Sequence, residues 1–314
     1  MSSLVAFELT PIYRQRVWGG QRLKAASPPI GEAWLVYEEN LVAVGPYAGR
    51  SLADVTALEG EALLGRRGGR LAGGRFPLLI KLLDCADWLS VQVHPNDQQA
   101  LEREGPGYLG KTEAWHILEA TPEAQVIAGL RPGASAAKLA QSLREGTLLN
   151  WLRYLPAQAG ETIFIPAGTV HALGPGILLY EVQQTSDLTY RLYDWDRPAA
   201  GGRALHLEKS LAAIDPQAGG QPIPAAQTQP DGRYPLVNCP YFHLELLTAH
   251  RQSLTLDTEG ESFHALTILE GQAQMTGDGW DRQLGRFGTI VVPAGCDHYH
   301  IKPLTHLRLL KVKV

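Results

Sequence analysis

The sequence predicts a mostly β fold assembled from two similar modules. It contains 33 glycines and 21 prolines among 314 residues, and both residue types interrupt helices and favour turns. Short apolar runs bounded by such turn residues recur along the chain, at lengths typical of strands. Hydrophobic residues make up 45% of the sequence, which is enough for a substantial core. Long helices and extensive disorder are therefore not expected.

Ten of these runs are expected to be strands. Each combines aliphatic and β-branched residues between turn residues. In chain order they span 33–37, 78–83, 89–93, 124–127, 162–165, 177–182, 241–247, 265–269, 289–292 and 307–312. Helices are expected in the minority of the chain that remains.

Helical patterns occur at four places. Ser51 and Asp54 form a capping-box pattern ahead of apolar residues that are mostly spaced three and four apart. The other three helices are expected after residue 95, over about 135–154 with a break at Gly146, and at 205–214. These helices lie within or beside the first module.

A repeat supports the two modules. The segments 160–171 and 285–298 both read as a strand, a Pro-Ala-Gly turn, two further residues and a histidine. The stretch 216–235 holds five prolines and few large apolar residues, which is typical of a linker. We therefore expect a first domain at 1–215, a linker at 216–235 and a second domain at 236–314.

A strand that runs into PAGxxH resembles the second signature of the cupin barrel, a small jelly roll whose turn places the histidine at the barrel mouth. Two copies in one chain imply two tandem cupin modules. The helices are then inserted in the N-terminal module or flank it.

The composition disfavours several classes of function. A net charge of −4 with 19% charged residues indicates no basic face for nucleic acid. No apolar run approaches the roughly 18 residues of a membrane span, and the N-terminal stretch lacks a basic region ahead of its apolar residues. The three cysteines form no CxxC pair, which suits a reducing compartment. We expect a cytoplasmic protein without nucleic-acid or membrane partners.

A set of potential metal ligands lies in the first module. Gln92 and His94 alternate with valines, so both side chains point to one face of a strand. Glu113 offers a carboxylate, and His171 follows the first Pro-Ala-Gly turn. Two imidazoles, a carboxylate and an amide oxygen suit Zn²⁺, while Fe²⁺, Mn²⁺ and Co²⁺ accept similar ligands. Each residue alone is weak evidence, and the combination predicts a metal site.

The C-terminal copy has a poorer set of ligands. His298 occupies the PAGxxH position and His264 precedes it, but Leu266 stands where a second imidazole would be needed. This module is therefore expected to be structural.

Several motifs of the N-terminal part resemble one enzyme family. VQVHP at 91–95, GKTE at 110–113, PAGTVHAL at 166–173 and TYRLYDW at 189–195 look like those of type I mannose-6-phosphate isomerases in their short bacterial form. The similarity covers about residues 10–210. It implies a zinc-dependent isomerase of the cupin superfamily that interconverts mannose 6-phosphate and fructose 6-phosphate. It also implies one Zn²⁺ per chain, with ligands Gln92, His94, Glu113 and His171, and an active-site arginine at Arg191.

This reaction moves a proton between C1 and C2 of the sugar through an enediol, so positive charge is needed beside the reacting oxygen. Arg191 would supply that charge, and Lys111, two residues before Glu113, would hold substrate oxygens or phosphate. Lys81 lies in an apolar run, where burial would lower its pKa toward that of a useful base. A metal-bound hydroxide or Glu181 could act as the base instead.

Two other functions fit part of the pattern. Two histidines and a carboxylate also describe the site of a non-haem iron oxygenase, and a cupin can bind a sugar without catalysis. The cationic residues Lys81, Lys111 and Arg191 favour the isomerase. The basic, glycine-rich stretch 65–74 is interpreted as a mobile surface loop, since no P-loop or similar phosphate motif appears. The sequence leaves the phosphate-binding residues and the oligomeric state open.

Overall fold

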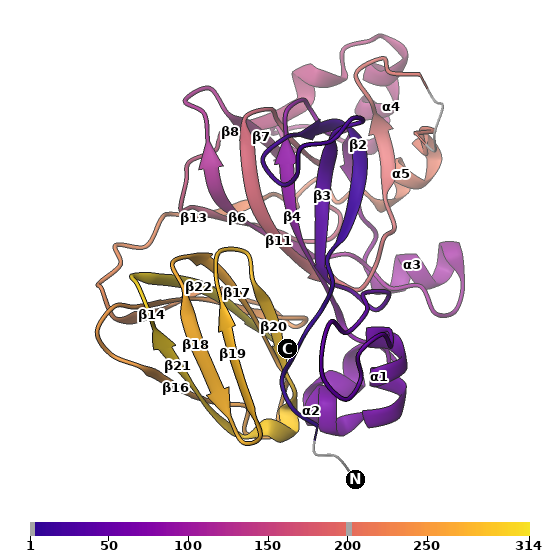
Figure 1. Ribbon diagram of the computed structural model, residues 1–314. Helices are drawn as coiled ribbons and strands as arrows, with labels where there is room; N and C mark the ends of the chain where they lie inside the picture. Colours follow the sequence, from indigo (N-terminus) through magenta and orange to yellow (C-terminus); the bar gives the residue numbers. More distant parts are fainter. Residues whose placement is uncertain (1–3, 199–202) are drawn as a thin grey trace. The chain divides into compact units, whose positions relative to one another are not determined.

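The structure is a computed structural model that describes residues 4–198 and 203–314 (Figure 1). Strands dominate the described residues, which form 22 strands and five α-helices. This confirms the mostly β fold. Among the described residues, no helix has the length and apolar character needed to cross a membrane.

The chain forms two compact units, and each contains separate stretches of sequence. Unit 1 contains Met1–Ile12, Trp34–Ile80 and Ala226–Val314, while unit 2 contains Tyr13–Ala33 and Lys81–Ala225. This division differs from the expected single boundary at 216–235. Residues early in the chain join unit 1 because strand β1 (Phe7–Glu8) pairs with β20 (Thr289–Val292). Helix α2 (Glu61–Leu71) also packs on the short helix η2 (Ala294–Cys296).

Unit 2 is built on two facing sheets. The first has the order β13-β9-β6-β11-β4-β2-β3, and boundaries between the units fall inside β2, β3 and β4. Its strands are β13 (Gln221–Ile223), β9 (Thr162–Ile165), β6 (Glu113–Ala120), β11 (Ile177–Gln184), β4 (Leu78–Cys85), β2 (Ile12–Gly20) and β3 (Ile30–Val36). The second sheet has the order β12 (Tyr190–Tyr193), β5 (Val91–Val93), β10 (His171–Leu173), β7 (Gln125–Leu130) and β8 (Leu152–Pro156).

Side chains from both sheets of unit 2 form one hydrophobic core. Trp115 and Leu179 come from the first sheet, and Val126 and Leu173 come from the second. All four are at least 98% buried. Alternation along each strand sends these side chains inward, which is the packing of a β-sandwich closed as a jelly roll.

Unit 1 repeats this construction in the C-terminal part of the chain. One sheet has the order β1, β20, β17 (His264–Glu270), β22 (Leu307–Lys313), β15 (His243–Ala249) and β14 (Gly232–Asn238). The other has the order β16 (Leu254–Asp257), β21 (His298–Pro303), β18 (Ala273–Gly277) and β19 (Trp280–Leu284). Leu266 and Ile290 of the first sheet pack with Met275 and Ile301 of the second. The expected pair of cupin modules is confirmed.

The four expected helices are present, with one shortened. They are α1 (Leu52–Glu59), α3 (Asp97–Glu104), α4 (Ala136–Arg144) and α5 (Leu207–Ala213). Ser51 and Asp54 form the expected capping box of α1. The helix expected through residue 154 is wrong beyond η1 (Leu148–Trp151), because the chain then enters β8 and pairs with β7.

The interpretation of the stretch 65–74 as a loop is also wrong for most of its length. Helix α2 (Glu61–Leu71) runs through it, with a kink at Gly65. Leu63 and Leu64 are fully buried on one side of this helix, and Gly68 lies against Val314 and Phe263. Tertiary packing thus supports a helix that three glycines would disfavour in isolation.

Candidate metal centre

Three neighbouring strands of unit 2 carry three of the predicted residues, and a fourth, His94, directly follows one of them. The antiparallel register pairs Gln92 of β5 with His171 of β10 on one side and with Arg191 of β12 on the other. Paired residues of antiparallel strands point to the same face, and His94 lies two residues beyond Gln92. The sheet therefore presents this row of side chains on one surface.

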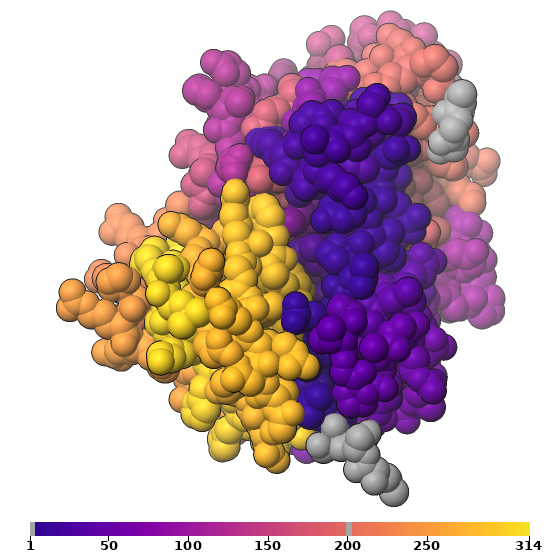
Figure 2. Space-filling view, viewed as in Figure 1, coloured from indigo at the N-terminus to yellow at the C-terminus, as the bar shows by residue number. Residues whose placement is uncertain are grey.

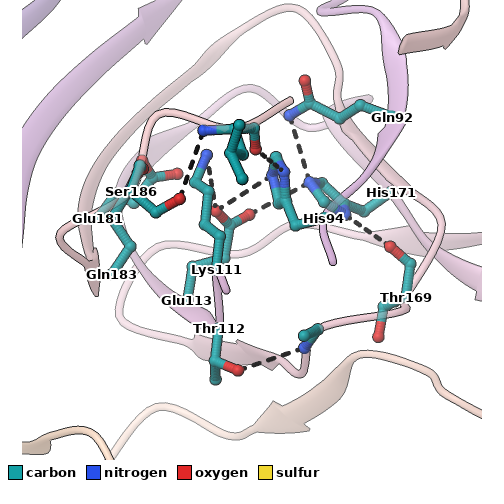
Figure 3. A network of polar contacts seen from close by, with 12 residues as sticks. Gln92, His94, Lys111, Thr112, Glu113, Thr169, His171, Glu181, Gln183 and Ser186 are labelled. Atoms are coloured by element: carbon teal, nitrogen blue, oxygen red, sulfur yellow. Dashed lines mark hydrogen bonds and ion pairs between the residues drawn. The ribbon is translucent and has the colours of Figure 1, made fainter. Parts of the chain in front are cut away.

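Glu113, the first residue of β6, joins this row from the other sheet of unit 2 (Figure 3). Its Oε1 lies 3.2 Å from Nε2 of His171, and its Oε2 lies 3.6 Å from Nε2 of His94. The ligand atoms of His94, Glu113 and His171 all lie within 4.8 Å of one another, and all three residues are 1% exposed. Within 4–198 and 203–314, this is the only such group of three or more His, Cys, Asp and Glu residues.

Backbone carbonyl groups orient both imidazoles. Nδ1 of His94 donates to the carbonyl oxygen of Leu188 at 2.7 Å, and Nδ1 of His171 donates to that of Thr169 at 2.8 Å. Because a carbonyl oxygen only accepts hydrogen bonds, each Nδ1 carries the proton and each Nε2 keeps its lone pair. Both Nε2 atoms then lie beside the carboxylate of Glu113, in the arrangement typical of metal-binding histidines.

The burial of the cluster fits a cation. Burial lowers the pKa of His94 well below its usual value and that of His171 to about 4, so both rings are neutral. Burial also raises the pKa of Glu113 to about 7. Nε2 of His94 and Oε1 of Glu113 have no hydrogen-bond partner, and Oε2 of Glu113 has only the neighbouring ammonium group of Lys111. Buried polar atoms without partners are costly, and a divalent metal would bind all three.

Gln92 lies at the edge of this cluster. Its amide Nε2 donates to Nε2 of His171 across 3.2 Å. A half-turn of the amide would bring Oε1 to the same position and offer a fourth ligand. Its role as a metal ligand stays a prediction.

Lys111 lies beside the cluster as the sequence suggested. It precedes β6, is 5% exposed, and places its Nζ 3.3 Å from Oε2 of Glu113. The ammonium group thus adds a buried positive charge next to the candidate ligands.

Lys81 of β4 is buried, but its expected low pKa is wrong. Its Nζ donates to Oε1 of Glu181 at 2.8 Å and to Oε1 of Gln183 at 2.6 Å. Burial lowers the pKa of Lys81, but attraction to Glu181, Glu32 and Glu113, with the Glu181 hydrogen bond, outweighs burial and raises it. Lys81 is therefore protonated at neutral pH and cannot serve as a free-amine base.

Glu181 forms the centre of a second buried network. Its Oε2 accepts a hydrogen bond from Nε1 of Trp115 at 3.0 Å. Burial acts to raise the pKa of Glu181, but Lys81 and Lys111 lower it overall, so the group is ionised. Sequence reasoning missed Trp115 and Gln183. Both stand two residues after a residue already singled out, Glu113 or Glu181, so strand alternation could have identified them.

Arg191 lies in β12 with alternating burial, as the sequence predicted. Its Nη1 donates to the carbonyl oxygen of Ala204 at 3.1 Å. Burial, and then the nearby Arg203, lower the pKa of Arg191, although a guanidinium group stays protonated at any physiological pH. The residue therefore brings a permanent cation to the row that contains Gln92 and His171.

The corresponding residues of the C-terminal module do not converge. His298 is exposed and lies 2.9 Å from Oδ2 of Asp257 through its Nδ1. His264 is buried and shares a 2.7 Å hydrogen bond with the hydroxyl of Tyr299.

Comparisons with known proteins agree with this geometry. The family model "Phosphomannose isomerase type I, catalytic domain" matches residues 6–110. The mannose-6-phosphate isomerase ManA of Bacillus subtilis is 32% identical over 309 residues, which cover 93% of this chain and 94% of the relative. The mannose-6-phosphate isomerase of Streptococcus mutans is 39% identical over 212 residues, covering 64% and 65% of the two chains.

A solved structure extends the similarity to the whole chain. The crystal structure of the mannose 6-phosphate isomerase from Bacillus subtilis superimposes with a TM-score of 0.87 at 30% identity. The match covers 99% of this chain and 100% of that one. The sequence identity and its coverage show that the chain belongs to the type I phosphomannose isomerase family.

Proposed function

We propose that the protein is a zinc-dependent isomerase that interconverts mannose 6-phosphate and fructose 6-phosphate through an enediol. The observation that carries this proposal is the buried cluster of His94, Glu113 and His171, in a chain that belongs to this family. Gln92 completes a proposed set of four ligands for one zinc ion per chain. When bound, the metal supplies a Lewis acid for a substrate oxygen.

The residues around the cluster have distinct proposed roles. Arg191 carries the permanent positive charge that stabilises negative charge on the enediolate oxygen. Lys111 lies at hydrogen-bond reach of the cluster and binds substrate oxygens. Lys81 has a catalytic role as a protonated cation. Its hydrogen bonds to Glu181 and Gln183 keep the Glu181 carboxylate ionised and in place. These roles place three cations around an anionic sugar in a protein of net charge −4.

The proposal is tested by incubating the purified protein with fructose 6-phosphate. We expect mannose 6-phosphate to form, the activity to disappear with a chelator, and zinc to restore it to a chelated sample. Metal analysis should give one zinc per chain. Absence of chelator-sensitive mannose 6-phosphate would overturn the proposal.

The same sample separates the alternative functions. Oxygen consumption that requires iron, without sugar-phosphate turnover, would assign an oxygenase. Sugar-phosphate binding by calorimetry without interconversion would assign a binding protein.

The three cysteines are free, which accords with a reducing compartment, and we place the protein in the cytoplasm. A cell fraction probed with an antibody tests that location.

A further inference from the structure

A basic groove lies on helix α2, within unit 1. It has a volume of about 450 Å³ and is lined by Arg66, Arg67, Arg70, Leu71 and Glu261. We call it the α2 groove. The purple surface of α1 and α2 lies beside the yellow C-terminal module in the space-filling view (Figure 2). All five residues belong to unit 1, whereas the candidate metal ligands belong to unit 2.

Helix α2 approaches the backbone of Glu261 at its kink, Gly65. Gly65 has a φ of +77°, and a Cβ there would lie 2.4 Å from the carbonyl group of Glu261. Beyond the kink, the backbone N–H groups of Arg66 and Arg67 donate to the carbonyl oxygens of Gly260 and Glu261. These N–H groups are already paired, so the donors that remain for a ligand belong to the guanidinium groups.

Only one of the three arginines is neutralised by a partner. Arg66 forms an ion pair with Glu261 and donates to the carbonyl oxygen of Glu259 at 3.1 Å. The side chains of Arg67 and Arg70 have no hydrogen bond or ion pair to any of the residues that the structure describes. Arg66 and Arg70 also stand one helical turn apart, where like charges repel. The groove therefore concentrates positive charge, which an anion would compensate.

From this charge and shape we infer that the α2 groove binds a small molecule that carries a phosphate or diphosphate group. A guanidinium group matches two phosphate oxygens at once, and Arg67 and Arg70 both have free donors for such contacts. The volume falls in the range of small-molecule sites, and Leu71 supplies an apolar wall for the organic part of the ligand. The net charge of −4 gives the protein no overall positive charge that would attract a long polyanion, which favours a small anion.

The test measures binding of inorganic pyrophosphate to the full chain by calorimetry at low salt. We expect submillimolar affinity, and at least tenfold weaker binding after the double substitution Arg67→Gln and Arg70→Gln. Both side chains are exposed, so the fold and the isomerase activity should be unchanged. Any binding at the metal centre would survive this substitution and is thereby distinguished. Arg50→Gln is the matched control, because Arg50 is an exposed arginine of the same unit outside the groove.

Two further variants test the recognition itself. Replacing Arg67 and Arg70 by Lys keeps the charge but removes the paired N–H donors of the guanidinium groups. We therefore expect several-fold weaker binding of pyrophosphate. Glu261→Gln frees Arg66, so we expect about threefold tighter binding. The inference is overturned if the wild type does not bind pyrophosphate, if the double Gln substitution leaves its affinity unchanged, or if sulfate binds equally well. Tighter, equally variant-sensitive binding of single-stranded DNA would also overturn it, in favour of a polyanion.

Discussion

The two copies of the Pro-Ala-Gly motif have the same spacing, but the histidine is buried in one copy and exposed in the other. His171 follows its turn into β10 and is 1% exposed among the candidate ligands. His298, at the same spacing, leaves its turn with 72% of its side chain exposed. The next residue, Tyr299, points into the core of unit 1 instead. The motif therefore fixes the position of a histidine in the chain but not its direction.

The difference arises in the turn itself. After Pro166 the chain makes a turn that is closed by a hydrogen bond from the N–H of Thr169 to the carbonyl oxygen of Pro166, with Gly168 at a φ of +85°. After Pro293 it makes the short helix η2 (Ala294–Cys296), and Asp297 then takes a φ of +49°. This changes which residue of the following strand faces inward. A metal site thus requires the turn conformation as well as the motif.

The largest expected effect separates the two histidines directly. His171→Ala removes a buried ligand, so we expect loss of the bound metal and at least about a 10³-fold loss of kcat/KM. His298→Ala is the matched control and should keep both, because its side chain is exposed and apart from the cluster. Metal analysis and turnover of mannose 6-phosphate check this. Metal loss in His298→Ala would break the comparison.

Arg191→Ala should show the next largest effect. The substitution removes a cation but no candidate ligand, so turnover should fall by about 10²-fold while the metal content stays at the wild-type level. Metal analysis and steady-state kinetics on the same preparation measure both quantities. If Arg191→Ala loses its metal, or keeps full turnover, Arg191 does not have the proposed role.

The buried His264 of the C-terminal module should make the stability of the protein depend on pH. Burial, with Lys311, Lys313 and Arg233 nearby, lowers the pKa of His264 to about 3. Unfolding restores an ordinary pKa near 6.5, so below that pH the unfolded chain binds a proton that the folded chain does not. The free energy of unfolding then falls as the pH falls, by about 2 kcal/mol from His264 between pH 6.5 and 5.

The control for this prediction is His264→Gln, which removes the titrating group and keeps a polar partner for Tyr299. Urea unfolding of both proteins at several pH values gives the difference between them, in which the other histidines cancel. If the free energy of unfolding of the variant falls equally steeply as the pH falls, His264 is not held neutral in the folded protein.

The smallest effect is expected at the hydroxyl group that binds His264. Tyr299→Phe removes one buried hydrogen bond, and we expect the free energy of unfolding to fall by about 1 kcal/mol. Activity and metal content should not change. Urea unfolding at neutral pH measures the stability, and loss of metal in this variant would contradict the structural role of the C-terminal module.

Local patterns predicted much of the fold and of the site. The capping box at Ser51, the helix after residue 95 and the alternation around Gln92, Glu113 and Arg191 all depend on neighbours within a few residues. Strand alternation also allowed the face of each candidate side chain to be deduced. These features require no knowledge of distant partners.

Other features depend on long-range partners and could not be predicted. Helix α2 forms over GRRGGRL because residues of the C-terminal part pack against its buried face. The pKa of Lys81 rises because β11 brings Glu181 beside it, 100 residues further along the chain. Strand β2 (Ile12–Gly20) was missed because its exposed residues interrupt the apolar pattern. For α2 and Lys81, the deciding contact is absent from the local sequence.

The interleaved course of the chain has a consequence for its synthesis. Unit 1 needs residues from both ends of the sequence, since Phe7 pairs with Val291. The segment Trp34–Ile80 can complete its unit only after Ala226–Val314 has been synthesised. On a ribosome, which adds about 5–20 residues per second, that segment is exposed for several seconds or more before its partners exist. The leucines that α2 buries in the folded protein are accessible to chaperones during this time. The residues of unit 2 are all synthesised before the C-terminal part of unit 1. Folding of this protein therefore finishes with the unit whose sequence began first.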